Sequence, residues 1–427
     1  MASRRSRRAA GEPELELATP THFRCPISLE LMKDPVTVST GITYDRQSIE
    51  RWLDMGHSTC PVTNQSLGGE LELIPNHAIR RMIQDWCVTN RSFGVERIPT
   101  PRIPVSPVQA SNMLSEMALA SRLGDVGRCG ELVGRVKALV KESERNRRCF
   151  VSSGAGRVLS CTFSEFAVKS LKGYSIGAVL EEILSVISSM APLDEDACWY
   201  LRSPESMSAI VSILQSGDLG RRLNAVLVVK ELVSRRNENG IETVAKTEGL
   251  VEALVKLIKE PISPQTTKAS LVATYYLVSS GEKTAERFVD MGIVSLLLEI
   301  LVDSEKSMSE KALAVLDSVL VSEKAKKIAY DNALSLPVLV KKMFRISDMA
   351  TEFAVSAIWK LCKKGGEECL VEALQVGAFQ KLLLLLQVGC SSATKEKATE
   401  LLKLLNGSKR KLECIDVMDF RGLKRPL

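Results

Sequence analysis

Long apolar runs are missing from this sequence. The longest candidate, residues 382–386, is far shorter than the roughly 20 residues that a helix needs to cross a bilayer. The chain begins MASRRSRRAAGEPE, which is polar and basic and lacks the apolar core of a signal peptide. We therefore expect a soluble, intracellular protein that is cytoplasmic and also open to the nucleus, with at most peripheral membrane contact.

Aromatic residues make up only 5% of the 427 residues, and the formal net charge of +6 is modest for this length. No basic groove motif with interleaved aromatic residues is visible, so we expect no nucleic-acid binding. Basic residues in the first 20 positions predict a disordered arm, although such a cluster can also be a nuclear address. Eleven scattered cysteines, an odd number, indicate free thiols rather than a disulfide framework.

A small module is predicted over residues 21–97, beginning FRCPISLELMKDPVTVSTGITYDRQSIERWL at Phe23. Apolar residues on either side of Ser39-Thr40-Gly41 predict two strands joined by a turn. Asp45 stands where its carboxylate would cap a first helix, and Asn76 stands where a second helix would begin. Apolar residues at helical spacing support both helices: Ile49, Trp52 and Leu53 in the first, and Ile79, Met82, Ile83 and Trp86 in the second.

A zinc site has to be weighed in so small a module. His22 with Cys25, and His57 with Cys60, form two H-x-x-C pairs that could in principle supply four ligands. Most zinc modules use C-x-x-C pairs instead, and each cysteine here is followed by Pro among apolar residues, which favours buried thiols. We expect no metal, no cofactor and no catalytic side chain. No His is placed to activate either cysteine as a thioester-forming nucleophile.

The order FRCPISLELMKDPVTVSTGITYDRQSIERWL, CPVTNQSL and LIPNHAIRRMIQDW resembles a U-box. That resemblance implies a RING-like fold without metal, which recruits a ubiquitin-conjugating enzyme and positions its ubiquitin thioester for direct transfer to a substrate lysine. By position, the enzyme contacts fall on Ile27 and Leu29 of a first loop and Pro61 of a second, with Trp52 in the groove between them. Asn64 stands where several related proteins carry a ubiquitin-positioning Arg or Lys.

A spacer and a repeat follow the module. Residues 98–108 read IPTPRIPVSPV, which predicts a semi-rigid linker or a docking site for a proline-recognising domain. Gly249, Gly292 and Gly377 each begin a leucine-rich segment, and the intervals between them are 43 and 85 residues, one and two repeats. Alanines within the intervening helical segments recur at nearly the same interval: Ala225, Ala269, Ala312, Ala354 and Ala398. A period of this size predicts stacked helices in a solenoid.

The repeats resemble armadillo repeats, which we place at residues 203–408, after a helical region of degenerate or capping repeats at 109–202 and before a tail at 409–427. The expected fold is mainly α: a small α+β U-box followed by an armadillo α-solenoid. Asn224 and Trp359 lie in repeat helices but do not form a recurring ladder.

The whole chain resembles plant U-box ubiquitin ligases with armadillo repeats. That resemblance implies an E3 ubiquitin transferase whose partners are a conjugating enzyme, ubiquitin and a protein substrate bound in the armadillo groove. It also implies a role in stress or defence signalling, and it leaves homodimerisation open. The alternative is an armadillo scaffold with an inactive U-box.

Overall fold

The computed structural model describes residues 19–68, 73–99, 104–171, 176–235 and 238–419. The expected basic arm, part of the expected linker (100–103) and the end of the expected tail (420–427) lie outside these ranges. Contacts divide the chain into two units, residues 1–104 and 105–427, and each is described by itself.

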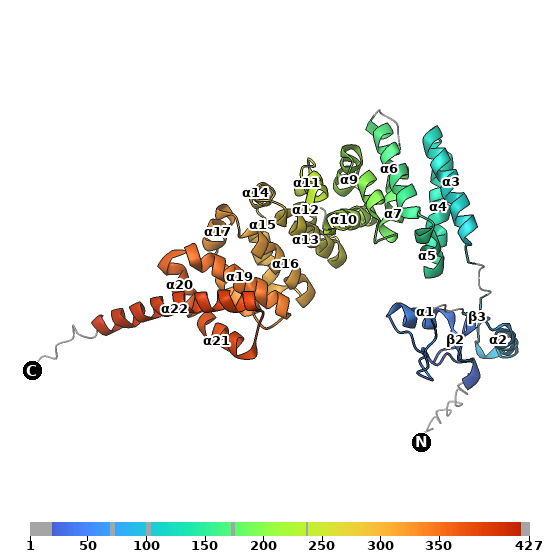
Figure 1. Cartoon of the computed structure of the whole chain (residues 1–427), viewed down its shortest axis with the longest axis horizontal. Helices are drawn as coiled ribbons and strands as arrows, with labels where there is room; N and C mark the ends of the chain where they lie inside the picture. The colour runs from blue at the N-terminus through green and yellow to red at the C-terminus, as the bar shows by residue number, and fades with distance from the viewer. Residues whose placement is uncertain (1–18, 69–72, 100–103, 172–175, 236–237, 420–427) are drawn as a thin grey trace, which may run out of the picture. The chain divides into compact units, whose positions relative to one another are not determined.

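The N-terminal unit is a three-stranded antiparallel sheet with two α-helices (Figure 1). Its elements are η1 (Thr21–Phe23), β1 (Pro35–Thr37), β2 (Thr43–Asp45), α1 (Arg46–Asp54), β3 (Ile74–Pro75), α2 (His77–Thr89) and η2 (Arg91–Phe93). The strand order is β2-β1-β3, with Val36 opposite both Tyr44 and Pro75. The predicted strand–turn–strand is confirmed, and Gly41 supplies the positive φ (80°) that its turn requires.

One of the two predicted helix caps is confirmed. Asn76 Oδ1 accepts a hydrogen bond from the Ile79 amide at 3.0 Å, at the start of α2. Asp45 precedes α1, but its side chain does not cap that helix, so this prediction is wrong. Its Oδ1 accepts from the amides of Lys33 (2.8 Å) and Asp34 (2.9 Å) instead. Those donors are remote in sequence, and only the tertiary fold brings them to the carboxylate.

The core of this unit is formed by apolar side chains from both helices, from strands β1 and β2 and from the connecting segments. Tyr44, Ile49 and Ile83 are fully buried, whereas Ile79 and Trp86 are partly buried against them. Met82, predicted to lie on the same apolar face of α2, is 51% exposed. Its position at the border of the stripe turns it towards solvent, because the small sheet covers only a narrow face of the helix.

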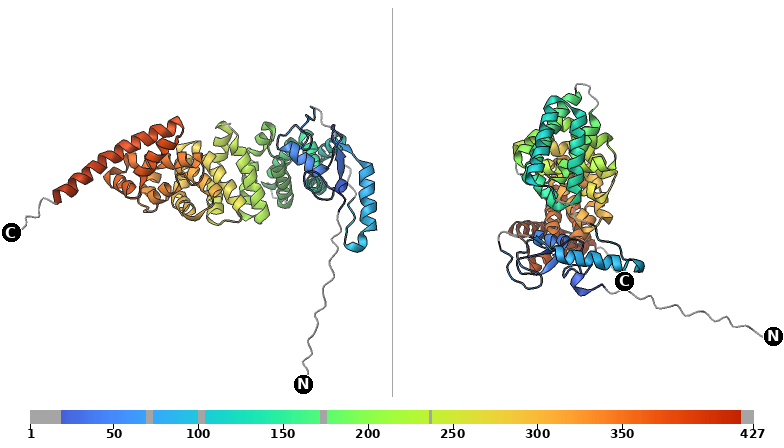
Figure 2. Two further views of the ribbon diagram at one scale, coloured as in Figure 1. Left: turned by 90° about the horizontal axis from the view of Figure 1, so that it is seen from below. Right: turned by 90° about the vertical axis from the view of Figure 1, so that its right-hand side faces the viewer.

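The second unit is a stack of α-helices that follow one another in chain order (Figures 1 and 2). Each complete repeat contributes a first, a second and a third helix. The first helices are α5 (Glu144–Ser152), α8 (Glu195–Leu201), α11 (Glu238–Ala245), α14 (Glu282–Asp290), α17 (Glu323–Tyr330) and α20 (Gly366–Gln375). The second helices are α3 (Pro107–Leu123), α6 (Ala155–Leu171), α9 (Pro204–Ser216), α12 (Leu250–Lys259), α15 (Ile293–Asp303), α18 (Ser335–Lys342) and α21 (Ala378–Val388). The third helices are α4 (Val126–Glu142), α7 (Gly177–Ser189), α10 (Leu219–Ser234), α13 (Pro264–Ser279), α16 (Lys306–Val319), α19 (Asp348–Lys364) and α22 (Ser392–Asp419).

Small residues at one position allow the third helices to pack closely against one another. The helix alanines that keep the repeat interval are all buried: Ala225, Ala269, Ala312, Ala354 and Ala398. The repeated glycines precede α12, α15 and α21 with φ of 74°, 77° and 82°, a conformation that side chains disfavour. In the repeat between those that begin at Gly292 and Gly377, the corresponding residue is Leu334. It precedes α18 with φ of −82°, so that helix starts without a glycine.

The stretch 124–166, within the predicted region of degenerate or capping repeats, forms α4, α5 and most of α6. At both ends of the array the structure extends the helices beyond the predicted limits. Ser106 and Gln109 make a capping box that starts α3 at Pro107, inside the expected linker. At the other end α22 continues through Asp419, past the expected end of the repeats. Within the described ranges, no single helix has the length and hydropathy of a membrane span, and the bent pair α20–α21 passes on length and composition only.

Candidate functional site

Two loops of the N-terminal unit share one backbone geometry, and both begin at a buried Cys followed by Pro. In each, the cysteine amide donates at 2.8 Å to the carbonyl five residues later. The cysteine carbonyl accepts at 2.8 Å from the amide four residues later. The first loop (residues 25–30) starts at Cys25 and the second (residues 60–65) at Cys60. Each is a rigid turn that projects the side chains between its two ends.

Two consecutive residues at the junction of β2 and α1 hold the two loops. The Asp45 amide donates to Cys25 Sγ at 3.3 Å, and the Tyr44 hydroxyl lies 3.0 Å from Cys60 Sγ. Thr40 Oγ1 donates to the same Cys60 sulfur at 3.3 Å. Both sulfurs are buried. The sheet therefore fixes the two loops beside α1 through hydrogen bonds to sulfur.

The hydrogen bonds also change the acidity of the second cysteine. Burial by itself would raise the pKa of the Cys60 thiol, but hydrogen bonds from Thr40, Thr63 and Tyr44 outweigh burial and lower this pKa to about 6. Burial and the hydrogen bond to Cys60 raise the pKa of the Tyr44 phenol. The phenol therefore keeps its proton and donates it towards the sulfur.

The loops present apolar side chains to solvent. Leu29 is 69% exposed, while Ile27 and Pro61 are half-buried, and Ile27 also packs against the core. Val62, which sequence reasoning did not single out, is 53% exposed. Val62 directly follows Cys60-Pro61, just as Ile27 directly follows Cys25-Pro26. This repeated Cys-Pro-apolar pattern is the signal in the sequence that could have identified Val62.

Trp52 lies on α1, half-buried against the core and bonded to the second loop. Its Nε1 donates to the Thr59 carbonyl at 2.8 Å, and its ring stacks on His57 with centroids 4.0 Å apart. The indole therefore holds the segment that leads into the second loop. The side chain is only partly covered, so part of it remains exposed to solvent.

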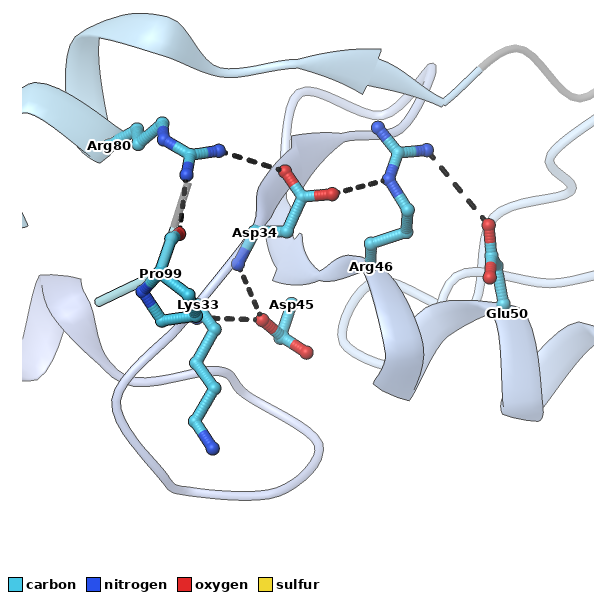
Figure 3. A network of polar contacts seen from close by, with 7 residues as sticks. All are labelled: Lys33, Asp34, Asp45, Arg46, Glu50, Arg80 and Pro99. Atoms are coloured by element: carbon cyan, nitrogen blue, oxygen red, sulfur yellow. Dashed lines mark hydrogen bonds and ion pairs between the residues drawn. The ribbon is translucent and has the colours of Figure 1, made fainter. Parts of the chain in front are cut away.

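An ion-pair network joins the segment before β1 to both helices (Figure 3). Asp34 accepts from Arg46 Nε at 2.7 Å and from Arg80 Nη1 at 3.5 Å. Arg80 also donates to the Pro99 carbonyl at 2.7 Å, and Arg46 reaches Glu50 at 3.9 Å. The network ties the start of the central strand β1 to α1, α2 and the end of the unit, and it helps to stabilise a small core.

The two H-x-x-C pairs do not come together as a metal site. His57 stacks on Trp52, and the His22 ring contacts Phe23 with centroids 4.2 Å apart. Among the described residues, no group of three or more His, Cys, Asp or Glu side chains is placed to hold a metal ion.

In the helical array, two aromatic side chains of the third helices meet. The rings of Tyr275 on α13 and Phe353 on α19 lie 6.4 Å apart although α16 lies between these helices in the stack. Both rings therefore lie on the same face of the third helices. Asn224 accepts from Ser188 at 3.1 Å, and Trp359 donates to Glu400 at 2.8 Å, so both have local partners.

Comparison with known proteins agrees with this architecture. Residues 19–92 match the family model of the U-box domain, and residues 110–424 match that of the plant U-box protein ARM repeat region. U-box domain-containing protein 21 of Arabidopsis thaliana is 42% identical over 417 residues, which cover 97% of this chain and 94% of that protein. E3 ubiquitin-protein ligase PUB23 of the same plant is 33% identical over 405 residues, 93% of this chain and 95% of that protein.

An engineered protein solved by the Northeast Structural Genomics Consortium shares the fold alone, with a TM-score of 0.53 at 18% identity over 70% of this chain and 68% of that one. The mainly α fold, with a U-box followed by armadillo repeats, is confirmed. The chain belongs to the plant U-box proteins with an armadillo repeat region, a family that includes E3 ubiquitin ligases.

Proposed function

We propose that this protein is an E3 ubiquitin ligase whose U-box recruits a charged ubiquitin-conjugating enzyme through the two Cys-Pro loops. The observation that carries the proposal is the exposure of Leu29 and Val62 on rigid loops held by Tyr44 and Asp45. Apolar anchors on a preorganised surface are suited to a small, transient interface. Ile27, Pro61 and the exposed part of Trp52 complete this surface.

Catalysis in this proposal consists of positioning. The covalent chemistry takes place on the cysteine of the conjugating enzyme, and the U-box holds the thioester in a geometry open to attack by a substrate lysine. Cys25 and Cys60 are buried and bonded within the unit, so neither is placed to carry ubiquitin. Asn64 is exposed at the end of the second loop, where its amide could bond ubiquitin.

The armadillo repeats bind the protein substrate in this proposal. Tyr275 and Phe353, whose rings meet on one face of the third helices, are the aromatic anchors that support it. The family resemblance leads us to propose stress or defence signalling as the setting. For a given substrate, Tyr275→Ala and Phe353→Ala should reduce its ubiquitination and leave self-ubiquitination unchanged. A substrate modified equally well by both variants would contradict this assignment.

The direct test is self-ubiquitination with purified activating enzyme, a panel of conjugating enzymes, ubiquitin and ATP. Wild type should give ubiquitin ladders that are lost in Ile27→Ala and Leu29→Ala. Val88→Ala is the matched control, because Val88 is apolar and 59% exposed but lies on α2 rather than on either loop. Folded wild type without ladders from any conjugating enzyme would favour the scaffold with an inactive U-box.

A further inference from the structure

Two cysteines at the junction of the last two repeats face each other inside the array. Cys362 lies near the end of α19 and Cys369 in the first turns of α20, and their sulfurs are 3.7 Å apart. Both thiols are free and each residue is only 3% exposed. The separation exceeds the roughly 2.05 Å of a disulfide bond by a distance that a small side-chain or backbone shift can close.

The corner between these helices is held by a close glycine contact. A Cβ on Gly365 would lie 2.5 Å from Tyr330 Cε2 and 2.8 Å from Cys369 Cβ, so only glycine allows this approach. The Tyr330 hydroxyl donates to the Gly365 carbonyl and accepts from the Cys369 amide at 3.1 Å. One phenol therefore fixes both ends of the link that brings the sulfurs together.

The environment makes Cys369 the more reactive thiol. It stands near the N-terminus of α20, where the helix dipole favours a thiolate. The hydrogen bond with Cys362 lowers the pKa of Cys369, although burial and the charge of Glu372 act in the opposite direction. The same hydrogen bond and burial raise the pKa of Cys362. Its place near the start of α20 therefore assigns the first reaction to Cys369 and the second to Cys362.

The corner borders a pocket that is large enough for a small oxidant, although neither cysteine is among its lining residues. The pocket has a volume of about 250 Å³ and is lined by Tyr330, Leu361 and Gly365 together with Glu323 and lysines of α17 and α19. That volume exceeds the space occupied by a few water molecules, and hydrogen peroxide is only slightly larger than water. Cys362 directly follows the lining residue Leu361 in the sequence, and the lining residue Gly365 lies between Cys362 and Cys369.

We propose that Cys362 and Cys369 form a reversible redox pair, which a hydroperoxide such as hydrogen peroxide converts to a disulfide joining α19 to α20. The Cys369 thiolate attacks one peroxide oxygen, the O–O bond breaks, and a sulfenic acid and hydroxide form. Cys362, as it loses its proton, attacks the sulfenic sulfur; the S–S bond forms, the S–O bond breaks, and water leaves. In total, two thiols lose two electrons and two protons, and the peroxide is reduced to two waters.

The experiment uses the full chain, reduced, freed of reductant and exposed to hydrogen peroxide. Remaining thiols are alkylated under denaturing conditions, and the peptides are identified by mass spectrometry. We expect a peptide pair linked through Cys362 and Cys369 and lighter by two hydrogens, with both thiols recovered after dithiothreitol. Recovery of both as alkylated thiols, at peroxide doses that oxidise the half-buried Cys390, would overturn the proposal. Pairing of either with another cysteine would also overturn it.

Variants separate the two roles. In Cys362→Ser, Cys369 should accumulate as a sulfenic acid that dimedone traps. In Cys369→Ser, Cys362 should remain a thiol, because it loses its activated partner. Tyr330→Phe should slow disulfide formation several-fold, since the phenol no longer fixes the corner. Cys390→Ser is the matched control and should leave the rate unchanged. If a Cys→Ser chain fails to fold, the wild-type peptide map decides the proposal alone.

Discussion

Leu29 and Asn64 occupy the same position in the two Cys-Pro loops, and both have the left-handed backbone conformation, with φ of 60° and 56°. Each is the fourth residue after its cysteine. Asn tolerates this conformation because its short amide can bond the local backbone, whereas Leu adopts it at a cost of roughly 1 kcal/mol. A strained, 69% exposed Leu gains nothing from burial, so a role in binding explains its presence best.

Leu29→Asn should therefore separate stability from binding. Asn suits the backbone, so the free energy of unfolding should rise by a few tenths to about 1 kcal/mol. Loss of the apolar anchor should weaken binding of the conjugating enzyme about tenfold, as measured by calorimetric titration. Val88→Asn, on α2, is the control for an exposed apolar residue outside the loops. Unchanged affinity in Leu29→Asn would remove this residue from the interface.

Asn64→Arg should accelerate ubiquitin discharge from the conjugating enzyme. Arg adds a charged, forked donor that could bridge enzyme and ubiquitin, which the neutral amide does less well. The measurement is single-turnover discharge to free lysine. Asn64→Gly is the control, because it keeps the left-handed backbone and removes the side chain. An Arg variant with the wild-type discharge rate would rule out a positioning role at this position.

Asp34→Asn should destabilise the U-box by about 2 kcal/mol, because Arg46 and Arg80 would lose their shared carboxylate in a largely desolvated setting. Hydrogen exchange of U-box peptides in the full chain at increasing denaturant is the measurement, because Trp199 and Trp359 of the array would contribute to the fluorescence. Glu242→Gln breaks a fully solvated i,i+4 pair and should leave stability unchanged. Equal stability of the Asp34 variant and wild type would show that the network is dispensable.

The depressed pKa of Cys60 predicts a pH dependence of U-box stability. A thiol whose pKa is about 6 when folded and near 9 when unfolded stabilises the fold fully above pH 9. That contribution falls as the pH drops from 9 to 6, by at most about 4 kcal/mol. Hydrogen exchange of U-box peptides, corrected for intrinsic rates, should show this slope in wild type. Cys60→Ser should abolish the slope, and a flat wild-type profile would contradict a buried thiolate.

Gly292→Ala should destabilise the array by about 1–2 kcal/mol. A Cβ at this position has open space around it, so the cost comes from the positive φ alone. Gly134→Ala is the matched control, because it also has open space but lies within α4 without a positive φ. It should stabilise the array by about 0.5–1 kcal/mol, and thermal unfolding distinguishes the two signs.

Local signals in the sequence predicted much of the fold. The regular intervals of Gly249, Gly292 and Gly377 predicted the repeats, because glycine is needed where each second helix starts with a positive φ. The glycine pattern is interrupted at Leu334, because α18 starts with an ordinary negative φ and needs no glycine. The repeat there is formed by packing of α18 against its neighbouring helices. Helices α4 and α5 lie within the region 109–202, which was predicted to hold degenerate or capping repeats, although their individual limits were not predicted.

Residues close together in the chain were sufficient to predict the two Cys-Pro loops, the helix that begins after Asn76 and the helical repeat. Packing between distant segments, by contrast, places the Asp45 carboxylate on the amides of Lys33 and Asp34 instead of at the start of α1. It also decided that Val62 is exposed and that Cys362 faces Cys369. These features depend on which surfaces the fold brings together or leaves to solvent, and spacing along a chain does not record that.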